Sequence, residues 1–168
     1  FSSVHVYPKP QALFNLDKAV GCEPLEVTLQ NASAGATNYQ WEYGLGGGST
    51  TSDINQTRIY PNGTDSVVNY PIRLIALNAF GCSDTLLKPI AVYPRVVAQF
   101  DSIYSVCSPA NFTFQDRSVG ASFITWNFNN EAQSFNATPN HTFLNPGSTD
   151  EIDFVELIAE NAYQCRDT

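Results

Sequence analysis

The chain has 168 residues, of which 43% are hydrophobic and 14% charged, so it has enough apolar material for a packed core and is not a disordered polymer. Its net charge is −8 at pH 7 and no run of basic residues occurs, which argues against nucleic acid as a partner, because phosphate binding needs clustered positive charge. No stretch approaches the roughly 20 apolar residues that a membrane-spanning helix needs, so we expect no direct membrane insertion.

The first predicted element is the segment of residues 1–8. Its sequence Val4-His5-Val6-Tyr7-Pro8-Lys9 is similar to Ile90-Ala91-Val92-Tyr93-Pro94-Arg95, which lies 86 residues later. The later segment closes the first full copy of an internal repeat. We therefore expect residues 1–8 to be the last strand of a preceding repeat.

The second predicted element is a complete repeat, residues 9–94. Apolar and polar residues alternate with a period of two, as in residues 25–30, and clusters of Gly, Asn, Ser and Pro separate these runs. Such alternation indicates half-buried strands, and no capped helical stripe is found. The predicted fold class is all-β, with Trp41 in the core of the repeat.

The third predicted element is a second repeat, residues 95–168, which stops before the equivalent of its own last strand. Three residue pairs align the two copies. They are Cys22 with Cys107 and Trp41 with Trp126, each 85 residues apart, and Cys82 with Cys165, which are 83 residues apart. Trp126 is accordingly predicted to lie in the second core. The expected partners are neighbouring repeats of the same long chain.

The four cysteines fall two per copy at matching places, which favours one disulfide within each copy, Cys22 with Cys82 and Cys107 with Cys165. Each would close a loop of about 60 residues and contribute roughly 4 kcal/mol in the chain-entropy model. Disulfides indicate an oxidising compartment, so an extracellular location is expected. Zinc bound by four thiolates is the alternative, which the single spacing of the cysteines disfavours.

Three tracts resemble PKD domains, which are immunoglobulin-like sandwiches. Trp41-Glu42-Tyr43-Gly44-Leu45-Gly46 resembles the signature W-D-F-G-D-G, residues 139–147 look like P-x-H-T-Y-x-x-P-G, and residues 78–85 look like the ending N-x-x-G-C-x-D-T. Neither copy retains the acidic residue after the motif glycine. The resemblance implies tandem PKD-like sandwiches, and cysteine-bearing copies imply a large secreted surface protein of the gliding, type 9-secreting Bacteroidetes group.

Candidate chemical sites are few. The two histidines, His5 and His141, fall in different copies, and no triad or cofactor motif accompanies them, so we expect no enzyme activity and no cofactor. Residues 129–131 and 150–153 carry oxygen ligands that could serve calcium, although they lack the spacing of an EF-hand loop. Solvated turns explain these residues better.

Three short Asp-Ser/Thr-apolar sequences resemble the O-glycosylation sites of secreted proteins in the same bacterial group. Their hydroxyl residues are Ser66, Thr85 and Ser102. The resemblance implies that these three residues carry sugars in the native protein.

Three functions are consistent with this sequence. The leading hypothesis is a non-catalytic, semi-rigid extracellular stalk of a surface protein or adhesin, because the linkers at Pro8 and Pro94 are short and contain proline. The first alternative is an accessory module of a secreted hydrolase that binds surface glycans or proteins. The second is a fibre in which residues 2–7 of one chain complete the open second repeat of another. The stalk hypothesis and the resemblance to PKD repeats both assume that each disulfide lies within one copy.

Overall fold

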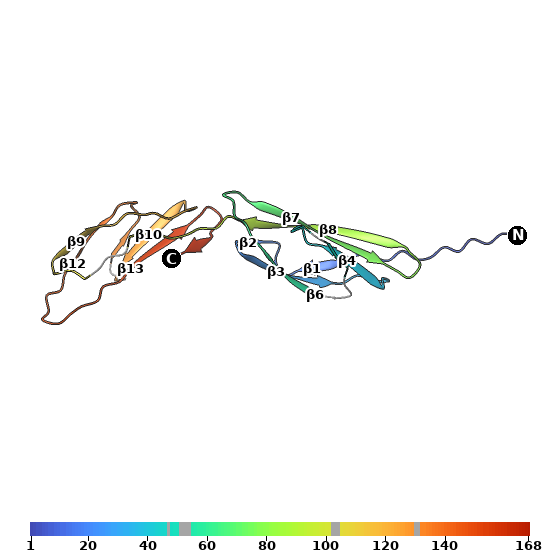
Figure 1. Ribbon diagram of the computed structural model, residues 1–168, viewed down its shortest axis with the longest axis horizontal. Coiled ribbons are helices and arrows are strands. Elements are labelled where there is room, and N and C mark those ends of the chain that lie inside the picture. Colours follow the sequence, from blue (N-terminus) through green and yellow to red (C-terminus); the bar gives the residue numbers. More distant parts are fainter. Residues whose placement is uncertain (47, 51–54, 102–104, 130–131) are drawn as a thin grey trace. The chain divides into compact units, whose positions relative to one another are not determined.

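The computed structural model of the protein describes residues 1–46, 48–50, 55–101, 105–129 and 132–168 (Figure 1). The chain divides into two compact units, unit 1 (Phe1–Pro94) and unit 2 (Arg95–Thr168). Every regular element within the described ranges is a β-strand, which confirms the predicted all-β class. The described residues contain no candidate for a membrane-spanning helix.

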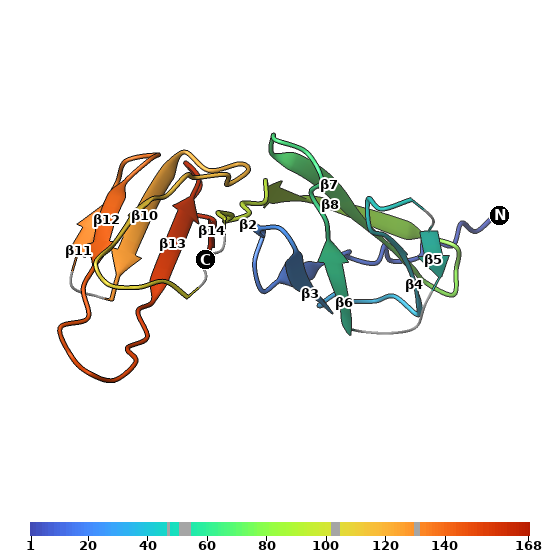
Figure 2. The ribbon, with the colours of Figure 1, turned by 60° about the vertical axis from the view of Figure 1, so that its left-hand side comes forward.

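Unit 1 is a sandwich of two sheets, which Figure 2 shows one against the other. Its strands are β1 (Phe14–Leu16), β2 (Val20–Cys22), β3 (Leu25–Asn31), β4 (Asn38–Glu42), β5 (Gly48–Thr50), β6 (Asn55–Tyr60), β7 (Val68–Leu77) and β8 (Ser83–Tyr93). One sheet has the order β1-β3-β6 and the other has the order β2-β8-β7-β4-β5. This division matches the immunoglobulin fold, in which the first, second and fifth principal strands face the third, sixth and seventh.

The core of unit 1 follows from the alternation in its strands. In β3, Leu25, Val27 and Leu29 are buried and the residues between them are not, as expected when every second side chain points inward. Trp41 of β4 is fully buried, and the ring of Phe14 packs edge-on against it with centroids 5.2 Å apart. These contacts join the two sheets.

Unit 2 has a smaller set of strands in two sheets. They are β9 (Ala110–Thr113), β10 (Phe123–Phe128), β11 (Ala132–Ser134), β12 (Asn140–Phe143), β13 (Val155–Glu160) and β14 (Arg166–Asp167). The orders are β11-β10-β13-β14 and β12-β9. Aromatic residues dominate this core: Phe114 contacts the rings of Trp126 and Phe128 at 5.4 and 5.2 Å, and Trp126 is fully buried.

The two units differ most at one sheet edge. In unit 1, β8 pairs with β7 over ten residue pairs, from Val68 with Val92 to Leu77 with Ser83. In unit 2, the strand that follows β13 is the two-residue β14, which pairs only with Ala159 and Glu160. Within the described part of unit 2, most of the β13 edge therefore lacks a partner strand.

Residues 1–8 form no strand and belong to unit 1. Val4 and Val6 are 86% and 89% exposed, whereas Ile90 and Val92, which answer them in the repeat, are fully buried in β8. The segment thus has the alternating apolar residues of a core strand, but these side chains are exposed and pack against no core. Its assignment to a preceding repeat remains a prediction.

Candidate functional site: the cysteine-bearing ends of the units

The turn that precedes Cys82 is organised by Asn78. The Asn78 Oδ1 accepts hydrogen bonds from the backbone N–H groups of Phe80 and Cys82, both at 3.0 Å. The Asn78 N–H donates to the Cys82 carbonyl, also at 3.0 Å, and Gly81 takes a positive φ of 80° that glycine adopts without steric cost. One asparagine therefore fixes the backbone on which Cys82 is presented.

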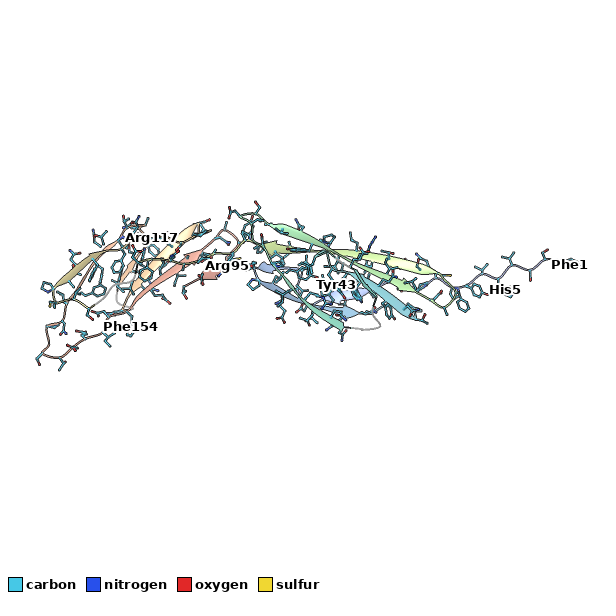
Figure 3. The ribbon with its side chains drawn as sticks, viewed as in Figure 1. Phe1, His5, Tyr43, Arg95, Arg117 and Phe154 are labelled. Atoms are coloured by element: carbon cyan, nitrogen blue, oxygen red, sulfur yellow. The ribbon has the colours of Figure 1, made fainter. Side chains whose placement is uncertain are left out.

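The chain that enters unit 1 is attached to this same turn. The ring of Tyr7 stacks on that of Phe80 with centroids 4.1 Å apart, and the Asn78 Nδ2 donates to the Pro8 carbonyl at 2.8 Å. The Lys9 ammonium lies 2.5 Å from a carboxylate oxygen of Asp84. We call this region, residues 78–84 with the segment it holds, the entry end of unit 1; Figure 3 shows Phe1 and His5 on the segment that leads to it.

Asp84 also holds the first residues of the module. Its Oδ2 accepts a hydrogen bond from the Ala12 N–H at 2.8 Å. The Lys9 ammonium, and secondly this N–H, lower the pKa of Asp84 from its ordinary value of 3.8, because both stabilise the carboxylate. Asp84 is therefore an ionised anchor for the entering chain.

Unit 2 has the same arrangement at the equivalent positions. The Asn161 Oδ1 accepts from the N–H groups of Tyr163 and Cys165 at 2.9 and 3.1 Å, and the Asp167 Oδ2 accepts from the Ala98 N–H at 2.8 Å. Residues 161–167 are therefore the entry end of unit 2, and they carry Cys165.

The other cysteine of each unit lies at the opposite end, which we call the exit end. In unit 1, Cys22 of β2 lies beside Tyr93, the last residue of β8. In unit 2, the chain runs from Cys107 through β9 to Val119, which pairs with Val97, the neighbour of the Ala98 held by Asp167. Cys107 is thus separated from the entry end by the length of the sheet.

The predicted disulfides are wrong. Cys22 and Cys165 are disulfide-bonded, whereas Cys82 and Cys107 are free, so neither Cys22–Cys82 nor Cys107–Cys165 forms and the chain holds one disulfide instead of one in each unit. The reason is distance. The eleven residues of β8 lie between the two cysteine-bearing ends of unit 1 and span roughly 33 Å at a rise of about 3.3 Å per residue, whereas a disulfide needs Cα atoms about 4.4–6.8 Å apart.

The same limit applies to unit 2. The six residues of β13 span roughly 17 Å between the level of Phe128 and the turn that carries Cys165. Each module therefore carries its two cysteines too far apart to bond to each other. The stalk hypothesis loses the support of disulfides within each copy and must rest on other contacts.

The other predicted site residues lie either in the cores or at the surface. Trp41 and Trp126 are both fully buried, so neither presents a ring to a ligand. Ser66 and Thr85 are exposed, which leaves their hydroxyl groups open to the predicted glycosylation, and Ser102 lies outside the described residues.

The predicted calcium ligands partly bond to one another. The Asn129 Nδ2 donates to the Asp153 carboxylate, and the Asn129 Oδ1 accepts from the Phe154 N–H at 2.6 Å. Asn130 and Glu131 lie outside the described residues. Among the residues that are described, no group of three or more His, Cys, Asp or Glu could hold a metal ion.

The residues that sequence reasoning missed are Asn78, Asn161, Asp84 and Asp167. All four stand in the recurring ending of the repeat and were visible there as letters of a motif. Their signal was a polar residue retained at the same place in both copies. A role could have been assigned from the ability of Asn and Asp side chains to bond backbone N–H groups two to four residues away.

No family model and no curated protein matches the sequence. The structure is similar to the PKD1 domain of the metalloprotease PrtV from Vibrio cholerae, with 29% identity over 51% of this chain and 99% of that one and a TM-score of 0.41. It is also similar to the PKD1 domain of Vibrio anguillarum Epp, with 21% identity over 52% and 96% of the chains and a TM-score of 0.41. A structure of carbohydrate-binding modules from the β-sandwich superfamily matches 89% of this chain and 84% of its own with 11% identity and a TM-score of 0.45.

Proposed function

We propose that the chain is a pair of non-catalytic, PKD-like spacer modules of an extracellular surface protein, and that its function is to hold other parts of that protein at a fixed distance. The observation that carries this proposal is the attachment of the entering chain to unit 1. Unit 1 contacts three consecutive residues of the entering segment. Tyr7 stacks on Phe80, Pro8 accepts an amide hydrogen bond and Lys9 forms an ion pair. Because these contacts fix the entering segment on unit 1, the module has a defined orientation relative to that segment.

The second support is the likeness of the two units. The Asn31 Oδ1 accepts from the Ser33 N–H at 2.9 Å, and the Asp116 Oδ1 accepts from the Ser118 N–H at 2.9 Å. Taken with the matching entry ends, these contacts favour two copies of one module. We propose that each copy grips the chain that enters it in the same way, and that the proline of each linker limits bending.

Small-angle scattering of the 168-residue chain tests the spacer proposal. The matched variant carries a flexible Gly-Ser insertion between Pro94 and Arg95, which leaves both units intact. Both proteins are measured after reduction, so that no disulfide contributes to the distribution. We expect the unmodified chain to give a narrow distribution of interatomic distances and the insertion variant a broad one. If the two distributions coincide, the linker does not restrict the modules and the spacer proposal is overturned.

A second candidate function is a fibre built by strand addition, which requires that the β13 edge accept a strand of another chain. An unpaired strand edge presents backbone N–H and C=O groups that can bond to an added strand. A surface fibre would result if residues 2–7 of another chain, in which Val4 and Val6 are exposed, filled that place. The mass of the native protein on a denaturing gel separates the two: a polypeptide far longer than 168 residues excludes a fibre of short subunits.

The carbohydrate-binding alternative has less support. It requires exposed aromatic platforms, and the two tryptophans that would be the strongest of these are fully buried in the cores. An extracellular location is common to all three hypotheses. The disulfide at Cys22 and Cys165 supports that location, because such bonds persist mainly in oxidising compartments.

A further inference from the structure

A buried asparagine holds the loop between β6 and β7, residues 61–67. Asn62 is 2% exposed. Its Nδ2 donates to the carbonyls of Ser66 and Val92 at 2.7 and 2.8 Å, and its Oδ1 accepts a hydrogen bond from the Thr64 N–H at 3.0 Å. Since Val92 belongs to β8, this one side chain orders its own loop and also ties the loop to the end of that strand.

The residue that follows Asn62 makes this side chain chemically labile. Asn62-Gly63 is the single Asn-Gly pair of the sequence. Glycine has no side chain to hinder the approach of its backbone nitrogen to the side-chain carbonyl carbon of the preceding asparagine, and its backbone moves freely. Gly63 is exposed, and a Cβ built on it would meet no atom within 4 Å. Neither glycine nor its surroundings therefore oppose ring closure onto Asn62.

Unit 2 has the same turn with an inert sequence. Asn145 is the equivalent of Asn62, and its Oδ1 accepts from the Gly147 N–H while its Nδ2 donates to the Thr149 carbonyl, both at 2.8 Å. These partners lie two and four residues after the asparagine, as they do in unit 1. The next residue, however, is Pro146, whose nitrogen carries no hydrogen and cannot close the ring. The turn therefore needs the asparagine but not the glycine.

The contacts of Asn62 prevent the reaction while the loop is closed. The side-chain nitrogen must gain a proton to leave as ammonia, and its two hydrogen-bond partners are carbonyl oxygens, which have no proton to give. Water does not reach a side chain that is 2% exposed. Rotation toward the Gly63 nitrogen would also break the hydrogen bonds to Ser66 and Val92. Opening of the loop removes each of these obstacles.

We propose that Asn62 is a deamidation site controlled by its loop: the closed loop preserves the asparagine, and opening of residues 61–67 converts it to aspartate or isoaspartate. The Gly63 nitrogen bonds to the side-chain carbonyl carbon of Asn62 and closes a succinimide ring. The bond from that carbon to Nδ2 breaks, and the nitrogen leaves as ammonia with the proton of Gly63. Water then adds to either ring carbonyl and opens the ring, so no oxidant or reductant is needed.

The conversion makes the opening permanent. A carboxylate donates no hydrogen bond, so an aspartate at position 62 would set its oxygens against the carbonyls of Ser66 and Val92 with no hydrogen between them. It would also bury a negative charge without a partner. Isoaspartate adds a methylene group to the backbone and displaces the side chain. Either product leaves the end of β8 without its tie to the loop.

Peptide mapping by mass spectrometry tests the protection of Asn62. The 168-residue chain is incubated at mildly alkaline pH in native buffer and in guanidinium chloride, and a synthetic peptide of residues 58–68 in both solvents corrects for the denaturant. The native rate equals the unfolded rate multiplied by the fraction of open loop, and we expect it to be at least about tenfold lower. Equal rates would show that the loop does not protect Asn62 and would overturn the inference.

Two substitutions separate the chemistry from the protection. Gly63→Pro gives unit 1 the sequence of unit 2 and should stop deamidation in both solvents, a result that does not require the variant to fold. Thr64→Ala removes a hydroxyl that lies 2.8 Å from the Asn62 Oδ1, so it should raise the native rate several-fold and leave the unfolded rate unchanged. Deamidation at Asn62 in Gly63→Pro, or any other response of the two rates to Thr64→Ala, overturns the inference.

Asn62→Asp tests permanence, with Asn145→Asp as the matched control. Both changes add one negative charge at the same position of the repeat, but Asn62 is buried and Asn145 only half-buried. Asn62→Asp should lower Tm by several degrees more than Asn145→Asp. An equal or smaller effect would show that the product fits the closed loop, against the inference. None of these measurements depends on the linker between the units, so the spacer proposal can fail in scattering while this inference stands.

Discussion

Asp84 accepts a hydrogen bond from the backbone N–H of Ala12 at 2.8 Å, across a separation of 72 residues in the sequence. The bond ties the start of unit 1 to the start of β8. The pKa of Asp84 in the folded protein lies below its ordinary value of 3.8. The carboxylate therefore stabilises the fold fully above pH 3.8, and this stabilisation is lost as the pH falls through the folded pKa. We expect Asp84→Asn to lower Tm by a few degrees at neutral pH and to weaken the fall of Tm on acidification from about pH 5 to about pH 2.

Asp65→Asn is the matched control, because it removes the same charge from an exposed position of the same unit. It should leave both the neutral Tm and the acid dependence close to those of the unmodified chain. Thermal unfolding followed by circular dichroism measures both quantities. Equal effects of the two substitutions would show that net charge, and not the bond to Ala12, produces the change.

Tyr60 should make the stability of unit 1 depend on pH above 10.0. Its ring is fully buried, and burial raises the pKa of Tyr60 from 10.0 to about 12. As the pH rises above 10.0 the unfolded phenol ionises before the folded one, so stability should fall between pH 10.0 and about pH 12. Tyr60→Phe should remove this fall, and at neutral pH it should be neutral or slightly stabilising, because the Tyr60 hydroxyl has no hydrogen-bond partner in the described structure.

Tyr70→Phe is the control for the Tyr60 variant. The rings of Tyr60 and Tyr70 lie 5.1 Å apart, but the Tyr70 hydroxyl donates to the Pro61 carbonyl at 2.6 Å. Losing that bond should cost about 1 kcal/mol at neutral pH. Urea unfolding at neutral and alkaline pH compares the two variants, and a larger neutral loss for Tyr60→Phe contradicts the argument.

The strands and the cores could be predicted from the sequence because they depend on local alternation. Residues 25–30 alternate in the printed sequence, and β3 buries Leu25, Val27 and Leu29 in that register. Trp41 could be placed in a core because an aromatic residue in mid-strand recurs at Trp126. A side chain that faces inward in a strand needs no knowledge of distant segments, so a period of two is sufficient.

The cysteine pairing could not be predicted, because it depends on which end of the sandwich each cysteine occupies. Cys22 and Cys82 lie at the ends of strands. The alternation of apolar and polar residues does not give the register of one strand relative to its neighbour. The missing information is the register in which Cys22 lies opposite Tyr93 instead of Ser83. The roles of Asn78 and Asp84 escaped for a related reason, since the segment they hold is distant in the sequence.

The tryptophans should prove structural and not ligand-binding. Trp41→Ala and Trp126→Ala should each destabilise the protein by about 3–5 kcal/mol, the usual cost of removing a fully buried large aromatic side chain. Urea unfolding measures the loss, and a glycan pull-down on the same samples measures binding. Loss of glycan binding by a variant that remains as stable as the parent would contradict the core assignment.

Conservative replacements distinguish the two tryptophans from each other. The Trp126 Nε1 donates to the Asn136 carbonyl at 3.1 Å, whereas the Trp41 Nε1 is buried without a hydrogen-bond partner in the described structure. Trp126→Phe should therefore cost about 1 kcal/mol more than Trp41→Phe, because it also leaves a carbonyl unpaired. Equal costs would indicate that water replaces the indole at Asn136.

Gly120 and Gly35 occupy equivalent positions of the repeat, and replacing each by alanine separates backbone strain from steric clash. Both have positive φ, 76° and 70°, where an L side chain costs about 1–2 kcal/mol. A Cβ at Gly120 would lie 2.5 Å from the Arg95 carbonyl oxygen, whereas at Gly35 the nearest atom, the Pro10 Cα, is 3.7 Å away. Gly35→Ala should therefore cost only the strain, about 1–2 kcal/mol, while Gly120→Ala must also displace the backbone at Arg95 and should cost about 3 kcal/mol or more. Urea unfolding of both variants measures the difference, with Gly63→Ala, which meets no atom within 4 Å, as the control for the substitution itself; equal costs at positions 35 and 120 would show that the backbone at Arg95 yields to the added methyl group.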